Sequence, residues 1–279
     1  MKKFILILLF IAVLIPLSIY SQKDSDTLYL KVMTYNIHHG EGLNGKIDLN
    51  RIAKIIRETG VDLVALQEVD QGTERSFGIK ILDSLSTLTK MHFYFDKNID
   101  FKGGEYGNGI LSRLPILVKY NYHYNMISEG EQRGLLQTVV DFLGNEILFM
   151  DTHLDASVND SERVSSIDEI NEQIKKYPDM PIIICGDFND TSLSRTYFKM
   201  NENFNDAWEK IGDGKGLTFP SDFPEKRIDY IFYSNRDRKK DKIIIEPALI
   251  TVYRSGASDH LPVIAEFKVI KKKLVKESH

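Results

Sequence analysis

The stretch Pro181-Ile182-Ile183-Ile184-Cys185-Gly186-Asp187-Phe188-Asn189-Asp190 is an apolar run that ends in a glycine and a group of polar side chains. A run of this kind, with proline only at its first position, is typical of a strand covered on both faces. Gly186 permits a sharp turn, so that Asp187 and Asn189 would project from the strand end into one cavity. Taken alone, the same residues also fit a polar turn after a core strand. The choice between the two depends on the other strands.

The composition predicts one large domain. The chain has 279 residues, 42% of them hydrophobic, and we find no internal repeat or low-complexity tract. We expect a single domain over residues 27–270 and a basic, solvated tail over residues 271–279. Without residues 1–21, 34 basic and 40 acidic side chains give a net charge of −6. This acidic balance does not predict tight, nonspecific binding of nucleic acid.

The N-terminus carries two lysines, an apolar run from residue 4 to residue 20 and then a polar segment. This pattern is typical of a secretory signal peptide over residues 1–21 and predicts export to the periplasm or out of the cell. The run of 17 residues also reaches the lower limit for a membrane-spanning helix, so an uncleaved anchor is the alternative. The single cysteine, Cys185, lies within the central strand, where we expect it to pack as a small hydrophobe.

Strand and helix patterns alternate along the chain, which predicts a layered α/β fold. Asp48 or Asn50 would cap the first helix, and Gly60 would end it in a left-handed conformation. Residues 96–107 are polar and glycine-rich, and they predict a surface loop. The helices are expected over residues 48–60, 79–90, 160–176 and 192–200. The strands are expected over residues 27–37, 61–69, 91–95, 108–112, 116–126, 135–142, 146–152, 181–187, 227–233, 242–252 and 262–269.

Polar side chains lie at or next to the ends of these strands. They are Asn36, Glu68, His153, Asp187 with Asn189, Asp229, and Asp259 with His260. Together their segments resemble, over about residues 30–267, the endonuclease/exonuclease/phosphatase superfamily. The resemblance implies a four-layer α/β/β/α sandwich of two packed mixed β-sheets flanked by helices, with the active site at one edge.

The residue types agree with metal-assisted hydrolysis of a phosphodiester. Glu68 and Asp259 offer the oxygen ligands that Mg²⁺ or Mn²⁺ prefers, and we find no thiolate or histidine cage that would select zinc. By its family position, Asn36 joins the metal ligands. Asp187 would orient or deprotonate the attacking water, and Asn189 would hold that water or a phosphoryl oxygen.

The histidines would act on the phosphoryl group and the leaving group. His260 would contact the phosphoryl group while Asp229 accepts its other ring proton and fixes the tautomer. His153 would stabilise developing charge or protonate the leaving group. The segment Thr152-His153-Leu154, with His38, favours the branch of DNases and sphingomyelinases over that of abasic-site endonucleases.

Arg133 matches a position at which several family members keep an arginine toward the phosphate. It would either bind the substrate phosphate or form a surface ion pair. The substrate stays open between nucleic acid, which would call for a basic groove, and a phospholipid headgroup, which would call for exposed aromatic residues. We therefore expect an exported, monomeric phosphodiesterase that uses Mg²⁺ and has no obligate protein partner. The alternatives are a catalytically silent binding module on the same fold or a phosphomonoesterase.

Overall fold

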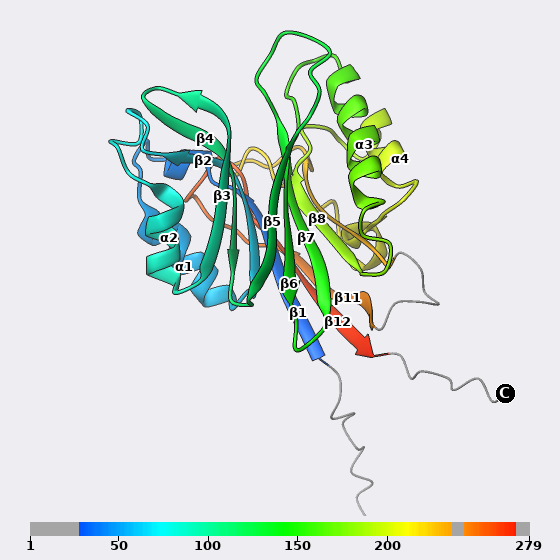
Figure 1. The fold of residues 1–279 in the computed structure, drawn as a ribbon. Coiled ribbons are helices and arrows are strands. Elements are labelled where there is room, and N and C mark those ends of the chain that lie inside the picture. The colour runs from blue at the N-terminus through cyan, green and yellow to red at the C-terminus, as the bar shows by residue number, and fades with distance from the viewer. Residues whose placement is uncertain (1–27, 236–242, 272–279) are drawn as a thin grey trace, which may run out of the picture.

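The computed structural model describes residues 28–235 and 243–271 (Figure 1). The expected signal peptide or anchor at residues 1–21 lies outside the described residues, as do residues 272–279 of the expected tail. Within the described residues, no helix combines the length and the apolar character needed to cross a membrane.

The described strands form two six-stranded sheets, which confirms the expected sandwich of two mixed sheets. The first sheet has the order β11-β12-β1-β2-β4-β3, and the second has the order β5-β6-β7-β8-β10-β9. The first sheet contains β1 (Leu28–Asn36), β2 (Leu63–Gln71), β3 (His92–Phe101), β4 (Gly104–Ser112), β11 (Ile243–Val252) and β12 (Val263–Lys271). The second contains β5 (Ile116–His123), β6 (Gly134–Asp141), β7 (Glu146–His153), β8 (Ile182–Asp187), β9 (Asn205–Asp206) and β10 (Asp229–Ser234).

Helices cover the outer face of each sheet, so the sandwich has four layers (Figure 1). Helices α1 (Leu49–Thr59) and α2 (Ile81–Thr89) lie on the first sheet, and α3 (Ser161–Ile174) and α4 (Arg195–Met200) lie on the second. The short α5 (Ala207–Ile211) packs beside β10 and β11, and the 3-10 turn η1 (His38–Gly40) follows β1. Asp48 caps α1 by accepting from Asn50 N, and Gly60 ends it at φ 66°, as the sequence predicts.

Side chains of the central strands alternate between two apolar layers, because successive residues of a strand point to opposite faces. In β8, Ile183 and Cys185 face the core between the sheets, while Ile182 and Ile184 pack toward the helices on the outer face. Burial of each such aliphatic side chain stabilises the fold by about 1.5–3 kcal/mol. The double burial explains why the sequence of β8 is continuously apolar, and it leaves polar side chains only at the strand end.

Residues 96–107 form a β-hairpin, so the expected surface loop was wrong. Strands β3 and β4 pair from His92↔Ser112 to Phe101↔Gly104, and only a short turn at Lys102 and Gly103 separates them. The glycines that indicated a loop instead permit close packing of the backbone. A Cβ atom on Gly107 would lie 2.3 Å from Asp96 O, and one on Gly104 would lie 2.5 Å from backbone atoms of the loop after β2.

Candidate active site at one edge of the sandwich

Three predicted residues stand side by side at the ends of neighbouring strands in the second sheet. The parallel pairing of β7 with β8 sets His153 opposite Asp187, and the antiparallel pairing of β8 with β10 sets Asp229 opposite Asp187. All three side chains are buried. The register of the sheet therefore assembles these groups, which lie far apart in the sequence, around the carboxylate of Asp187.

Gly186 allows the ends of β7 and β8 to come this close. A Cβ atom at this position would lie 2.1 Å from Thr152 O, a distance that no side chain tolerates. The glycine is therefore required by the approach of the neighbouring strand. It places Asp187 directly beside His153, the last residue of β7.

Glu68 reaches the same edge from the first sheet through a β-bulge. The register between β2 and β4 shifts between Leu66 and Val69, and Glu68 has a left-handed φ of 57°. An extra residue in a strand redirects the side chains around it. Gln67 accordingly turns toward the second sheet and donates to Asp151 Oδ1 at 2.6 Å, while the Glu68 carboxylate meets the end of β1.

Asn36, the last residue of β1, links the carboxylates of the two sheets. Its Nδ2 donates to Glu68 Oε1 at 3.0 Å and to Asp187 Oδ2 at 3.1 Å. Its Oδ1 accepts from the backbone N of His38 at 3.1 Å. In this arrangement Asn36 orients both carboxylates, and its role as a metal ligand stays a prediction.

His260 is held between two carboxylates. Its Nδ1 lies 2.9 Å from Asp229 Oδ2, and its Nε2 lies 3.7 Å from Asp187 Oδ2. Burial acts to lower the pKa of His260, but the charges of Asp229 and then Asp187 outweigh it and raise the pKa to about 10. The raised pKa favours the imidazolium form of His260 at neutral pH, and its Nε2 is directed at the Asp187 carboxylate.

Asp187 lies at the centre of the site. Burial, and then the charge of Asp229, raise the pKa of its carboxyl well above the usual range. The backbone N of Asn189 donates to Asp187 Oδ1 at 2.9 Å. Asn189 itself has a φ of 50°, and its Nδ2 donates to Leu154 O at 3.0 Å. This leaves its amide oxygen for a water or a substrate atom.

His153 lies on another side of the Asp187 carboxylate, and Arg133 lies near His153. His153 Nε2 lies 3.7 Å from Asp187 Oδ2, and burial, followed by the charge of Arg133, holds the pKa of His153 well below its usual value. His153 is thus a neutral imidazole at pH 7. The side chain of Arg133 is 11% exposed, and its Nη1 lies 2.8 Å from Glu131 Oε1. Arg133 therefore forms a largely buried ion pair beside the site, and its contact with substrate phosphate stays a prediction.

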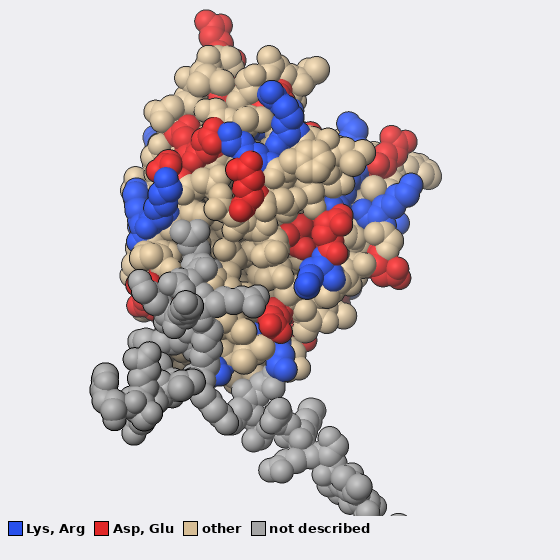
Figure 2. All heavy atoms as spheres, turned by 90° about the vertical axis from the view of Figure 1, so that its right-hand side faces the viewer, with Lys and Arg blue, Asp and Glu red and all other residues tan. Residues whose placement is uncertain are grey.

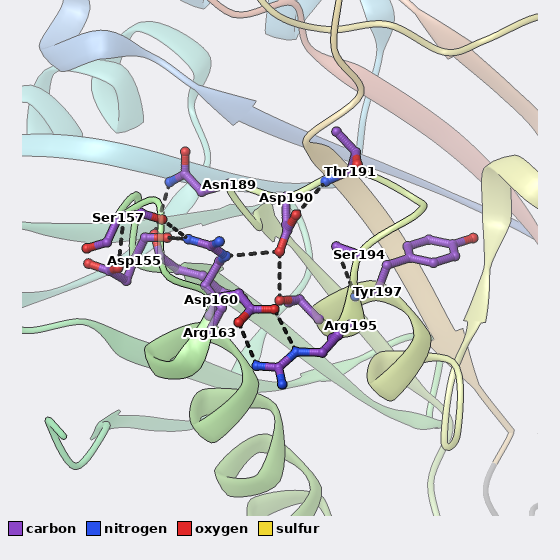
Figure 3. Close-up of polar contacts among 12 residues, drawn as sticks. Asp155, Ser157, Asp160, Arg163, Asn189, Asp190, Thr191, Ser194, Arg195 and Tyr197 are labelled. Atoms are coloured by element: carbon purple, nitrogen blue, oxygen red, sulfur yellow. Dashed lines mark hydrogen bonds and ion pairs between the residues drawn. The ribbon is translucent and has the colours of Figure 1, made fainter. Parts of the chain in front are cut away.

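A buried arginine braces the loops that follow β7 and β8, and sequence reasoning missed it (Figure 3). Arg163 on α3 donates Nη1 to Asp155 O at 2.9 Å and to Ser157 O at 2.6 Å. Its Nε donates to Asp190 Oδ2 at 3.1 Å, and Thr196 Oγ1 donates to the same oxygen. These loops directly follow His153 and Asp187. By holding the loops, Arg163 helps to fix the positions of these two residues.

Two consecutive histidines beside Glu68 were also missed. Nitrogens of His38 and His39 and an oxygen of Glu68 lie within 4.8 Å of one another. His38 Nδ1 lies 3.9 Å from Asp259 Oδ1, so Asp259 approaches the same group of side chains. The signal available in the sequence was the pair of histidines two residues after Asn36.

The comparisons with known proteins agree with this geometry. The sequence model of the Endonuclease/Exonuclease/phosphatase family matches residues 33–260. The chain belongs to this family.

Several known proteins resemble the chain over most of its length. The uncharacterized protein YbhP of Escherichia coli (strain K12) is 26% identical over 249 residues, which cover 85% of this chain and 95% of YbhP. A 5'-tyrosyl-DNA phosphodiesterase of Caenorhabditis elegans is 25% identical over 215 residues, covering 74% of this chain and 54% of that protein. The mannosyl-6-phosphatase of Bacteroides thetaiotaomicron has the same fold, with a TM-score of 0.70 and 19% identity over 86% of this chain and 99% of that chain.

The family hydrolyses phosphate esters and generally uses a divalent metal, and this edge holds side chains that could bind one, in the groups His38, His39, Glu68 and Asp187, Asp229, His260. Glu68 and Asp259 offer partly exposed carboxylates, which are hard oxygen ligands of the kind that Mg²⁺ prefers. One relative is a phosphodiesterase and one protein with the same fold is a phosphatase, so assignment to the branch of DNases and sphingomyelinases stays a prediction.

Proposed function

We propose that this chain is a divalent-metal-dependent phosphodiesterase in which Asp187 activates the attacking water. The observation that carries the proposal is the position of Asp187, in hydrogen-bond contact with Asn36 and Asn189 and 3.7 Å from both His153 and His260. A buried carboxylate with a raised pKa is suited to take a proton near neutral pH. The set thus combines a base with groups that bind phosphoryl oxygens.

The roles of the two histidines follow from their opposite charge states. The imidazolium of His260 would donate from Nε2 to a phosphoryl oxygen, while Asp229 holds its Nδ1. The neutral His153 would donate a hydrogen bond to the leaving oxygen or to the developing charge. Glu68 and Asp259, with Asn36, would hold the divalent ion, which when bound neutralises charge on the phosphoryl group.

The acidic charge balance of the chain gives less support to nucleic acid as the substrate. On the face shown in Figure 2, basic and acidic side chains of the described residues are interspersed, without a continuous basic patch. The relative that acts as a 5'-tyrosyl-DNA phosphodiesterase supports a diester substrate, and the mannosyl-6-phosphatase shares only the fold. A phosphomonoesterase remains the second candidate because that neighbour shows that the fold accommodates such a substrate.

Turnover of bis-p-nitrophenyl phosphate and of p-nitrophenyl phosphate by the full chain tests the proposal, in Mg²⁺, Mn²⁺ or EDTA. We expect EDTA-sensitive cleavage that prefers the diester. Asp187→Asn should lose about 10²-fold or more because it removes the base without changing volume. The matched control is Asp168→Asn, a change of an exposed carboxylate on α3.

Each alternative has its own outcome in the same assay. Preferential cleavage of the monoester would make the chain a phosphatase, and a folded protein that cleaves neither ester would be a binding module. Undiminished turnover in Asp187→Asn would refute the role of that residue.

We also propose export, which the pattern of residues 1–21 supports. Mass spectrometry of the N-terminus of the mature protein tests it, since an intact Met1 would exclude cleavage.

A further inference from the structure

The turn after β1 sets two imidazole rings beside Glu68. His38 and His39 lie in η1, with their ring centroids 4.4 Å apart in an edge-to-face contact. One nitrogen of each histidine and one oxygen of Glu68 lie within 4.8 Å of one another. Donors that share one ion at about 2.1 Å lie within roughly 4.2 Å of each other. Small side-chain rotations would therefore bring the three atoms onto a single ion.

His39 has a buried nitrogen that is not hydrogen-bonded. Its Nδ1 is enclosed and has no hydrogen-bond partner in the described part of the chain, while its Nε2 lies 3.6 Å from Glu41 Oε2. An unpaired buried donor or acceptor costs about 1–3 kcal/mol, so such a group calls for an explanation. Histidines that bind metals typically offer one nitrogen to the ion and the other to a carboxylate or carbonyl. In His39 the Nε2 lies on the side of the Glu41 carboxylate, so the unpaired Nδ1 is the nitrogen available to a metal ion.

The backbone holds all three residues in an unfavourable conformation. The φ angles are 44° at His38, 44° at His39 and 57° at Glu68, all in the left-handed region. Each such residue costs on the order of 1 kcal/mol, and strain of this kind concentrates at functional sites. All three proposed ligands have this strained backbone, although they come from two separate elements, η1 and β2.

We propose that His38, His39 and Glu68 bind a transition-metal dication such as Zn²⁺ in preference to Mg²⁺. Imidazole nitrogen suits zinc and the neighbouring transition metals, whereas Mg²⁺ requires oxygen ligands. The site goes beyond the proposed function, with which it shares only Glu68. The two histidines thus give this edge of the sandwich a second kind of metal ligand.

Calorimetric titration of the metal-free full chain with ZnCl₂ and, separately, with MgCl₂ tests the proposal. We expect His38→Asn and His39→Asn each to weaken Zn²⁺ binding by at least about tenfold, with little change in Mg²⁺ binding. Asparagine is chosen because it tolerates a left-handed φ. The control is His92→Asn, which changes an exposed histidine at the start of β3. Zn²⁺ binding that is the same in all four proteins would overturn the proposal.

A second measurement needs no variant. In the wild-type protein labelled with ¹⁵N-histidine, Zn²⁺ should shift the Nδ1 resonance of His39 and a ring nitrogen of His38. Zinc-induced shifts confined to other histidines would overturn the proposal even if the variants failed to fold. Neither readout depends on turnover, so a chain that binds Zn²⁺ here but cleaves no phosphate ester would refute the proposed function and leave this site standing.

Discussion

His260 Nδ1 lies 2.9 Å from Asp229 Oδ2, and the pair is buried beside Asp187. In the proposed mechanism Asp229 acts through His260, so we expect His260→Asn and Asp229→Asn to cause overlapping losses of kcat/KM. Each single change should cost about 10²-fold, and the double variant should cost little more than the worse single change. The measurement is kcat/KM of all four proteins on bis-p-nitrophenyl phosphate. Losses that multiply in the double variant would show that the two residues act independently.

The same pair should make stability depend on pH. Burial acts against the charge of His260, but Asp229 and Asp187 raise its pKa to about 10, above the value of about 6.5 in the unfolded chain. The folded state therefore binds this proton more tightly. The resulting stabilisation is complete below about pH 6.5 and is lost as the pH rises through 10. We expect the difference in the free energy of unfolding between wild type and Asp229→Asn, measured with urea in EDTA, to shrink over this range. A difference independent of pH would show that Asp229 does not raise the pKa of His260.

Arg163 should affect catalysis through the loops that it braces. Arg163→Met removes the hydrogen bonds to Asp155 O, Ser157 O and Asp190, and we expect kcat to fall by about tenfold or more because the reacting groups lose their alignment. The measurement is kcat and KM separately, at a temperature well below the midpoint of thermal unfolding. A change in KM alone would place Arg163 in substrate binding instead.

The neighbouring Arg195 supplies the matched control for this change. Its side chain is 68% exposed and pairs with Asp160 at 2.6 Å, in the same region of the structure (Figure 3). Arg195→Met should therefore change turnover and stability little, since exposed ion pairs contribute about 0–1 kcal/mol. Equal effects of Arg163→Met and Arg195→Met on turnover and stability would contradict a specific role for Arg163.

Gly186 should tolerate no side chain. Gly186→Ala would set a Cβ atom 2.1 Å from Thr152 O, and we expect a loss of about 3 kcal/mol or more in the free energy of unfolding. Gly144→Ala, in the turn after β6, should cost about 1–2 kcal/mol, because its φ is 82° but its surroundings are open. Urea unfolding of the two variants compares them directly. Similar losses of unfolding free energy in the two variants would mean that β7 can shift to make room for the added Cβ atom.

Much of the fold could be predicted because the central strands are buried on both faces, which leaves a plain pattern in the sequence. Strand β8 is the clearest case. The hairpin of β3 and β4 could not be predicted in the same way. A glycine that makes room for a neighbouring backbone, such as Gly107, has the same appearance in a sequence as a glycine in a loop.

The predicted site residues could be found because each lies at or near a strand end, where a polar side chain stands out against an apolar run. The structure brings them to one edge, while their individual roles stay predictions. The bulge that directs Glu68 depends on its partner strand β4, so the sequence of β2 does not reveal it. Arg163 was missed because an arginine on a helix is usually solvent-exposed, whereas this one is buried against the loops that it braces.

Two polar links cross from one sheet to the other next to the site, Asn36 to Asp187 and Gln67 to Asp151. The metal ligands expected at Glu68 and the base at Asp187 therefore stand on opposite halves of the molecule. Their separation depends on how the two sheets pack against each other and on Asn36, which donates to both carboxylates. A change in the packing between the two sheets, remote from any substrate, would therefore also change the geometry of the site.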